Sequence, residues 1–228
     1  MFTRTQTFAA FALIAATRIH AQQTRDFAPY LISDRAAEVA LARTAAPKRI
    51  SDSATVLVLT RTGFTTATKG SNGFTCLVER SFQGSVTDPT FWNPKVRAPH
   101  CFNPAATQSV LPQAMKRAEM ILAGVSTQEI VKREHEAYAS HALPAPAAGA
   151  MAYMLSPKQF LLDNDPHWMP HLMFYFDRSM PSPAWGAGGM TDAVIDDSGS
   201  DPKSPVRTLL IPVRRWSDGT PAVSTTDH

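Results

Sequence analysis

The chain contains only two cysteines, Cys76 and Cys101, and it lacks the common motifs of catalytic sites. It has no Gly-x-Ser-x-Gly elbow, no phosphate-binding glycine loop and no helical His-Glu-x-x-His pair. After the first 21 residues, no apolar run approaches the length of a membrane span. A serine hydrolase or a nucleotide-dependent enzyme with this sequence would have to be atypical, and we expect no cofactor.

The first 21 residues have the three parts of a secretory signal peptide. Arg4 supplies positive charge, residues 8–16 are an unbroken apolar stretch, and residues 17–21 form a more polar exit. Cleavage after Ala21 would make Gln22 the mature N-terminus. The alternatives are a first helix of the domain or a transit peptide. No cysteine follows the cleavage site and no paired-arginine motif precedes the apolar stretch. We therefore expect a periplasmic or secreted protein without a stable membrane anchor.

The charge of the chain gives no reason to expect nucleic acid as a partner. The 228 residues include 22 Lys plus Arg and 19 Asp plus Glu, but Arg4 and Arg18 would leave with the signal peptide. The remaining 20 basic and 19 acidic residues nearly balance, whereas nucleic-acid binding is indicated by clustered basic residues. The expected partner is an unknown small molecule or protein.

The two cysteines lie in the mature chain, where an oxidising compartment favours one disulfide between Cys76 and Cys101. Such a bond would close a loop of about 25 residues and contribute roughly 3–4 kcal/mol in the chain-entropy model. The alternatives are a reactive thiol or a metal ligand, the latter with His100 beside Cys101. The spacing of the cysteines does not favour zinc, haem attachment or thioredoxin-like exchange.

Local patterns predict three helices and six strands. Helices are expected over 34–44 and 111–123 and after a capping box formed by Ser126 and Glu129, with Gly124 as the cap of the second helix. Strands are expected over 56–59, 64–68, 74–79, 151–155, 172–176 and 208–213. We expect the first three strands to form an antiparallel meander with Cys76 on the third. The Pro-rich stretch 88–104, which holds Trp92 and Cys101, should be irregular.

Strands grouped in blocks predict a single α+β domain over 22–228. It should have a mainly antiparallel sheet of five to six strands, with the helical hairpin and the short N-terminal helix packed on one face. PAS-like and profilin-like domains share such an arrangement. Residues 181–205 should form a mobile surface loop, and residues 217–228 a flexible C-terminal tail.

The most suggestive polar cluster is the segment 163–171. Its acids and histidines are Asp163, Asp165, His167 and His171, which His100 could join. Such side chains in a loop can bind a divalent metal that activates water. Pro166 and Pro170 oppose the helix on which His-x-x-x-His would be a strong zinc signal. The alternative is a turn at 163–165, with Trp168 at the core edge and His171 satisfied by hydrogen bonds. The acidic segment 196–201 lacks the EF-hand pattern and predicts a solvated loop.

Aromatic and methionine residues near the Pro-rich loops are candidates for an apolar pocket. They are Trp92, Trp168, Met169 and Trp185. The alternative is that they are ordinary core and loop anchors.

Three stretches, 72–78, 152–156 and 170–175, carry a resemblance to exported bacterial proteins of uncharacterised function. This likeness covers most of the mature chain. It implies a secreted single domain, and it transfers no activity and no catalytic residue.

The leading functional hypothesis is an exported soluble domain that binds a small molecule, a peptide or a protein. A second hypothesis is a metal-dependent hydrolase that uses the cluster from Asp163 to His171. A third is a structural or inhibitory surface protein whose contact loop is 181–205.

Overall fold

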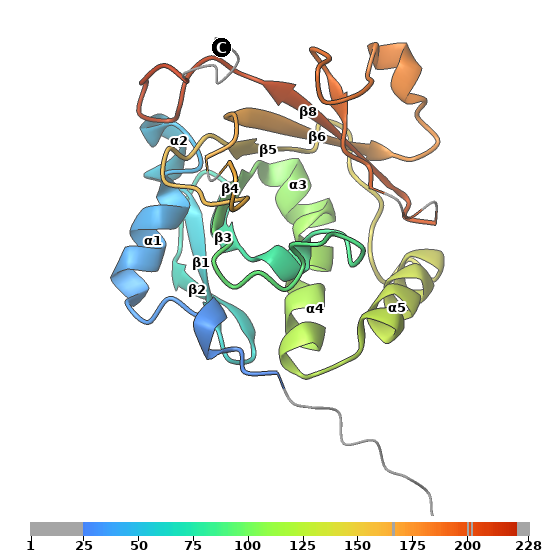
Figure 1. Ribbon diagram of the computed structural model, residues 1–228, viewed down its shortest axis with the longest axis horizontal. Helices are drawn as coiled ribbons and strands as arrows, with labels where there is room; N and C mark the ends of the chain where they lie inside the picture. Colours follow the sequence, from blue (N-terminus) through green and yellow to red (C-terminus); the bar gives the residue numbers. More distant parts are fainter. Residues whose placement is uncertain (1–24, 166, 200, 202, 223–228) are drawn as a thin grey trace, which may run out of the picture.

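The computed structural model describes residues 25–165, 167–199, 201 and 203–222, and it shows one mixed sheet with helices on both faces (Figure 1). The expected signal peptide over 1–21 lies outside the described residues. The α-helices are α1 (Arg35–Arg43), α2 (Lys48–Ser51), α3 (Pro104–Ser109), α4 (Leu111–Leu122) and α5 (Thr127–Ala139). The strands are β1 (Thr55–Thr60), β2 (Gly63–Thr68), β3 (Thr75–Glu79), β4 (Ala98–Phe102), β5 (Met151–Met154), β6 (His171–Asp177), β7 (Ile195–Asp196) and β8 (Val206–Pro212). Three short 3-10 helices are η1 (Ala28–Tyr30), η2 (Ser81–Gln83) and η3 (Ser182–Trp185). Within these described ranges, no helix is long and apolar enough to cross a membrane.

The eight strands found in the described residues follow the order β2-β1-β3-β4-β5-β6-β8-β7. All neighbours are antiparallel except β1 and β3. The α+β class is confirmed, but the expected meander of the first three strands is wrong, because β3 lies beside β1 on the side away from β2. Between β2 and β3 the chain must pass the start of β1, and Gly70 lies at this crossing, where its N–H donates to Thr55 Oγ1. A Cβ at Gly70 would lie 2.2 Å from the backbone carbonyl carbon of Ala54.

The sequence patterns missed β4 and β7. Pro99 and His100 predicted irregular chain, yet all five residues of β4 pair with β3, so the partner strand overrides local preference. Cys101 therefore lies on a strand, directly opposite Cys76, and not on an irregular excursion. The two Sγ atoms are 2.00 Å apart. The predicted pairing of the cysteines is confirmed.

The central strands are buried on both faces. Alternate residues of a strand point to opposite faces. One set packs with the alanines of α1 and the turn after it: Val56, Cys76, Val78 and Cys101. The other set packs in the larger core cluster with α3 and α4: Leu57, Leu59, Leu77 and Phe102. The expectation that all helices share one face is therefore wrong for α1.

A buried ion pair joins α1 to the residue after β3. Arg80 Nη2 lies 2.7 Å from Glu38 Oε1, and both residues are almost completely buried. Glu38 also accepts a hydrogen bond from the Leu59 N–H, and Arg80 Nε donates to the Tyr30 carbonyl. Burial lowers the pKa of Arg80, while the charge of Glu38 acts in the opposite direction. Because this pair and its hydrogen bonds connect α1 with β1, η1 and the residue after β3, it fixes the position of α1 on the sheet.

Helices α4 and α5 form the predicted helical hairpin. Gly124 has a φ of +76° and follows α4. Ser126 begins α5, because its Oγ accepts a hydrogen bond from the Glu129 N–H at 3.3 Å. Both local predictions are confirmed. In Figure 1, α4 lies inside the curve of the sheet and α5 stands further out, beyond α4.

The last part of the chain contains more regular structure than expected. The segment 181–205 carries η3 and β7, and β7 extends the sheet by pairing with β8. Residues 214–222 form a hydrogen-bonded turn, in which the Ala222 N–H donates to the Arg214 carbonyl. The mobility of 181–205 and the flexibility of the tail stay predictions, and residues 223–228 lie outside the described part.

Candidate functional site

A cavity of about 560 Å³ lies between the sheet and the helix pair α4 and α5. Its floor is formed by side chains of β3, β4, β5, β6 and β8, and its rim by residues 83–88 and the segment after β7. Apolar floor residues include Phe102, Met154, Met173 and Leu210. The volume lies within the range of about 300–1,000 Å³ that is typical of small-molecule sites.

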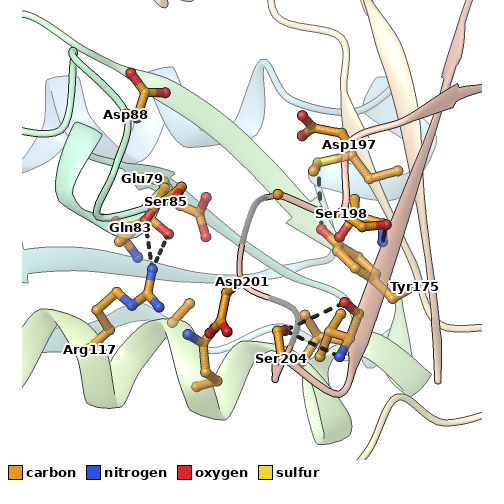
Figure 2. A pocket seen from close by; sticks show the side chains of 18 of the residues that line it. Glu79, Gln83, Ser85, Asp88, Arg117, Tyr175, Asp197, Ser198, Asp201 and Ser204 are labelled. Atoms are coloured by element: carbon orange, nitrogen blue, oxygen red, sulfur yellow. Dashed lines mark hydrogen bonds between the residues drawn. The ribbon is translucent and has the colours of Figure 1, made fainter. Parts of the chain in front are cut away.

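Carboxylates from separate segments surround this cavity. Figure 2 shows Glu79 at the end of β3, Asp88 on the rim, and Asp197 and Asp201 on the segment after β7. Asp201 has a partner in His135, whose Nε2 lies 2.7 Å from its Oδ2. Asp88 accepts hydrogen bonds from the backbone N–H and the hydroxyl of Thr90. Asp197 differs, because no described residue donates a hydrogen bond to its carboxylate.

The Asp197 carboxyl has a raised pKa of about 6. Loss of hydration within the cavity wall is the largest cause, followed by the negative charges of Asp196 and Asp88. The side chain is nevertheless open to a water-sized molecule, because it faces the cavity and not packed protein. Asp197 is therefore a carboxylate held near other negative charges, with space in front of it.

Glu79 and His100 form a pair on the cavity floor. Glu79 Oε2 lies 2.7 Å from His100 Nδ1, an ion-pair distance, although the angle between the groups is not that of a hydrogen bond. On the other side of the ring, His100 Nε2 lies 3.0 Å from the Met173 sulfur. The imidazole thus connects a carboxylate to a thioether.

His171 is a second histidine of the floor, and its side chain is almost completely buried. Its Nδ1 lies 2.9 Å from the Met169 carbonyl oxygen, to which it donates. Burial lowers the pKa of His171 to about 4, a hydrogen bond to Met169 opposes this shift, and the charge of His100 adds to it. His171 is therefore neutral at neutral pH. With the proton on Nδ1, its Nε2 carries a lone pair.

The wall between α4 and α5 is closed by an ion pair. Arg117 and Glu134 are joined by two hydrogen bonds, and the Arg117 Nη1 also donates to the Gly84 carbonyl oxygen at 2.6 Å. Because both partners are occupied by each other, this pair holds the helices together and leaves no free charge for a ligand.

The residues that the sequence predicted as metal ligands are divided between the surface and the cavity. Asp163 is exposed and pairs with Lys95 at 3.0 Å, Asp165 accepts a hydrogen bond from the Trp168 N–H, and His167 is exposed. His100 and His171 both line the cavity. Among the described residues, no group of three or more His, Cys, Asp and Glu side chains is placed to hold a metal.

The predicted apolar ligand-binding residues are also divided. Trp168 lines the cavity, with its ring 4.8 Å from that of His171. Met169 is half-buried and contributes its carbonyl to His171. Trp92 packs at the core edge against Phe91.

Trp185 lies away from the cavity. It packs on Phe174 and Phe176, which alternate along β6 with the cavity residues His171, Met173 and Tyr175. Strand alternation therefore places Trp185 on the opposite face of the sheet.

Sequence reasoning missed Glu79, Met173, Tyr175 and Asp197. One signal was present in β6, where the alternation of His171, Met173 and Tyr175 places three polar or polarisable side chains on one face. Burial raises the pKa of Tyr175 well above its usual value, and the charges of Glu79 and Asp197 add to this shift. Asp197 had no such signal, because its segment looked like a solvated loop.

The fold and the site together define a cavity-bearing α+β domain with an apolar floor and an acidic rim. No known protein family, no curated protein and no solved structure matches this chain. The case for its function therefore rests on the geometry of the cavity.

Proposed function

We propose that this protein is exported and binds a small organic molecule that has an apolar body and one positively charged group. The cavity between the sheet and the helices α4 and α5 would hold the molecule. The observation that carries this proposal is the Asp197 carboxylate, which opens onto an apolar cavity and lacks a partner among the described residues.

The charges around the cavity favour a cation. Glu79, Glu134 and Asp201 each have a basic partner, namely His100, Arg117 and His135. Asp196 is paired with Arg207. Asp197 has no basic partner among the described residues, and the nearby Asp88 and Asp196 raise its pKa. A bound cation would relieve this repulsion, so its binding should be stronger than that of a neutral molecule of the same shape.

The size of the cavity favours a small ligand over a folded protein. A volume of about 560 Å³ suits a molecule with one ring and a short chain. The floor offers Phe102 for ring stacking and the adaptable side chains of Met154 and Met173. The alternative of a metal-dependent hydrolase at 163–171 stays a prediction, and no contact among the described residues favours it.

Three probes of matched shape test this proposal: 2-phenylethylamine, which is cationic, 2-phenylethanol, which is neutral, and phenylacetate, which is anionic. Isothermal titration calorimetry at pH 7.5 measures the affinity of the purified protein for each probe. We expect the amine to bind at least about 10-fold more tightly than the alcohol, since one uncompensated charge pair in a partly closed site contributes about 1.4 kcal/mol or more. Phenylacetate should bind most weakly.

Two variants test whether Asp197 is the carboxylate that binds the charged group of the amine. Asp197→Asn should bring the amine to the affinity of the alcohol, while Asp52→Asn, an exposed change on the other side of the sheet beside Lys48, should leave the preference intact. Equal affinity of the wild-type protein for all three probes would contradict the proposed charge selectivity. Preference for the amine that survives Asp197→Asn would place the cation elsewhere.

A further inference from the structure

Two histidines on the cavity floor each hold Nδ1 close to an acceptor oxygen. In metal-binding histidines one ring nitrogen donates to a carboxylate or a backbone carbonyl, which leaves the other nitrogen free for the metal. His171 has this arrangement, because its Nδ1 donates to the Met169 carbonyl and no described residue hydrogen-bonds to its Nε2. In His100, Nδ1 lies 2.7 Å from Glu79 Oε2 without the angle of a hydrogen bond, and Nε2 contacts the Met173 sulfur.

Two methionines lie on the floor with these rings. Met173 shares the cavity face of β6 with His171, and its sulfur is 3.0 Å from His100 Nε2. Met154 is directly opposite His171 in the pairing of β5 with β6, and it packs in one cluster with Met173. The strand register and the cavity lining thus place two histidines and two methionines of three neighbouring strands on one floor.

The contact between His100 and Met173 brings two potential ligands of a soft metal ion together. His100 Nε2 lies 3.0 Å from the Met173 sulfur, to which a proton on Nε2 donates a hydrogen bond. Transfer of that proton to Nδ1, which lies 2.7 Å from Glu79 Oε2, would leave the lone pair on Nε2. A soft cation would then be bound by the nitrogen and the sulfur together.

We propose that His100, His171, Met154 and Met173 bind a single copper(I) ion. Thioether sulfur is a soft ligand that selects copper(I), and imidazole nitrogen also suits copper. Four neutral ligands match a monovalent ion better than a divalent one. The ion binds and leaves as copper(I), so no oxidant or reductant is needed. Two of the ligands are histidines that the sequence had already indicated as metal ligands, and the other two are methionines.

This site goes beyond the proposed binding of an organic cation and does not depend on it. The copper ligands lie on β4, β5 and β6 at the floor, whereas Asp197 and Asp88 lie at the exposed rim. The negative rim would raise the local concentration of either cation.

Anaerobic titration with the acetonitrile complex of copper(I) tests the site, with bathocuproine disulfonate as a coloured competitor. Thiol reductants are left out, because reduction of the bond between Cys76 and Cys101 would create thiolate ligands. We expect one copper(I) per chain. Met173→Leu and Met154→Leu keep the apolar volume but remove a sulfur, and each should weaken binding at least about 10-fold. Met190→Leu, an exposed methionine of the same cavity, should change the affinity less than about 2-fold.

A second measurement keeps the test valid if a variant folds poorly. Silver(I), which resembles copper(I) and is redox-inactive, is titrated into wild-type protein with ¹³C-labelled methionine methyl groups. The signals of Met154 and Met173 should shift, while those of Met115 and Met120 stay in place. Failure to retain copper against the competitor, or copper binding that leaves these two methyl signals and the two leucine variants unaffected, would overturn the proposal.

The two proposals can fail separately. Asp197→Asn should abolish the preference for 2-phenylethylamine and change copper(I) affinity less than about 3-fold, because the rim carboxylate is not a ligand. Met173→Leu should weaken copper(I) binding at least about 10-fold. It should leave the ratio of amine to alcohol affinity unchanged, because both probes would contact the floor alike and only Asp197 distinguishes their charge.

Discussion

At the scale of single residues, Asp197 determines how the cavity responds to pH. Its pKa of about 6 in the folded protein lies above the ordinary value of 3.8, so the folded protein holds this proton more tightly than the unfolded chain does. Ionisation of Asp197 therefore costs stability as the pH rises from about 4 to 6. The charged and titratable groups that face it are Asp196 on β7, Asp88 on the rim and Tyr175 on β6.

Removing the charge should consequently stabilise the protein above that pH window. We predict that Asp197→Asn raises the midpoint of thermal unfolding by about 1–3 °C at pH 7.5 and by less than about 1 °C at pH 4. Buried His171, with its lowered pKa, gives the wild-type protein an opposite slope between about 4 and 6.5. The difference between variant and wild type cancels this contribution. Differential scanning calorimetry at the two pH values measures the change in unfolding midpoint that Asp197→Asn causes. An equal change at both pH values would contradict the assigned pKa.

The same residues show what the sequence could reveal about the site. His100 and His171 were identifiable, because histidines next to a cysteine or within an acidic cluster suggest chemistry by themselves. Glu79 and Asp197 were not, since their role depends on which strand lies beside β3 and on where the segment after β7 folds. These are tertiary facts that no local pattern contains.

At the scale of elements, local signals predicted the helices better than the sheet. The hairpin of α4 and α5 is encoded by Gly124, Ser126 and Glu129, which act within one turn of the chain. The parallel pairing of β1 with β3 depends on the crossing at Gly70, and β4 exists because β3 and β5 lie beside it. A Pro-containing segment such as β4 looks irregular until its partners are known.

The crossing at Gly70 gives a direct test of this topology. Ala54 and Thr55 backbone atoms lie 2.2–2.3 Å from the position of a Cβ at Gly70, so a methyl group there would force the crossing away from β1. We predict that Gly70→Ala costs about 3 kcal/mol and lowers the unfolding midpoint by about 6–12 °C. The nearest atom to a Cβ at Gly189 is 3.9 Å away. Gly189→Ala is therefore a matched control, and we expect a shift below about 2 °C. Similar stability of the two variants would show that the chain does not cross at Gly70.

At the scale of the whole molecule, the two faces of the sheet have different roles. On one face α1 covers the disulfide and the alanine-rich cluster, and the structure there is closed. On the other face α4 covers only part of the sheet, and α5 stands further out, so that the half made by β4, β5, β6 and β8 forms the cavity floor (Figure 1). The expected signal peptide stays a prediction; export would provide oxidising conditions for the disulfide on this face.

If the cavity is the functional part of the molecule, filling it should abolish binding without unfolding the protein. Ala114 lies on α4 and lines the cavity. We predict that Ala114→Phe places its ring in this space, reduces the affinity for 2-phenylethylamine at least about 10-fold, and changes the unfolding midpoint by less than about 4 °C. Ala37→Phe, on the exposed side of α1, adds the same ring outside the cavity and should leave binding unchanged. Calorimetric titration and circular dichroism measure the two effects. Undiminished binding by a folded Ala114→Phe protein would show that the amine binds outside the cavity, and the acidic rim would then lose its role in recognition.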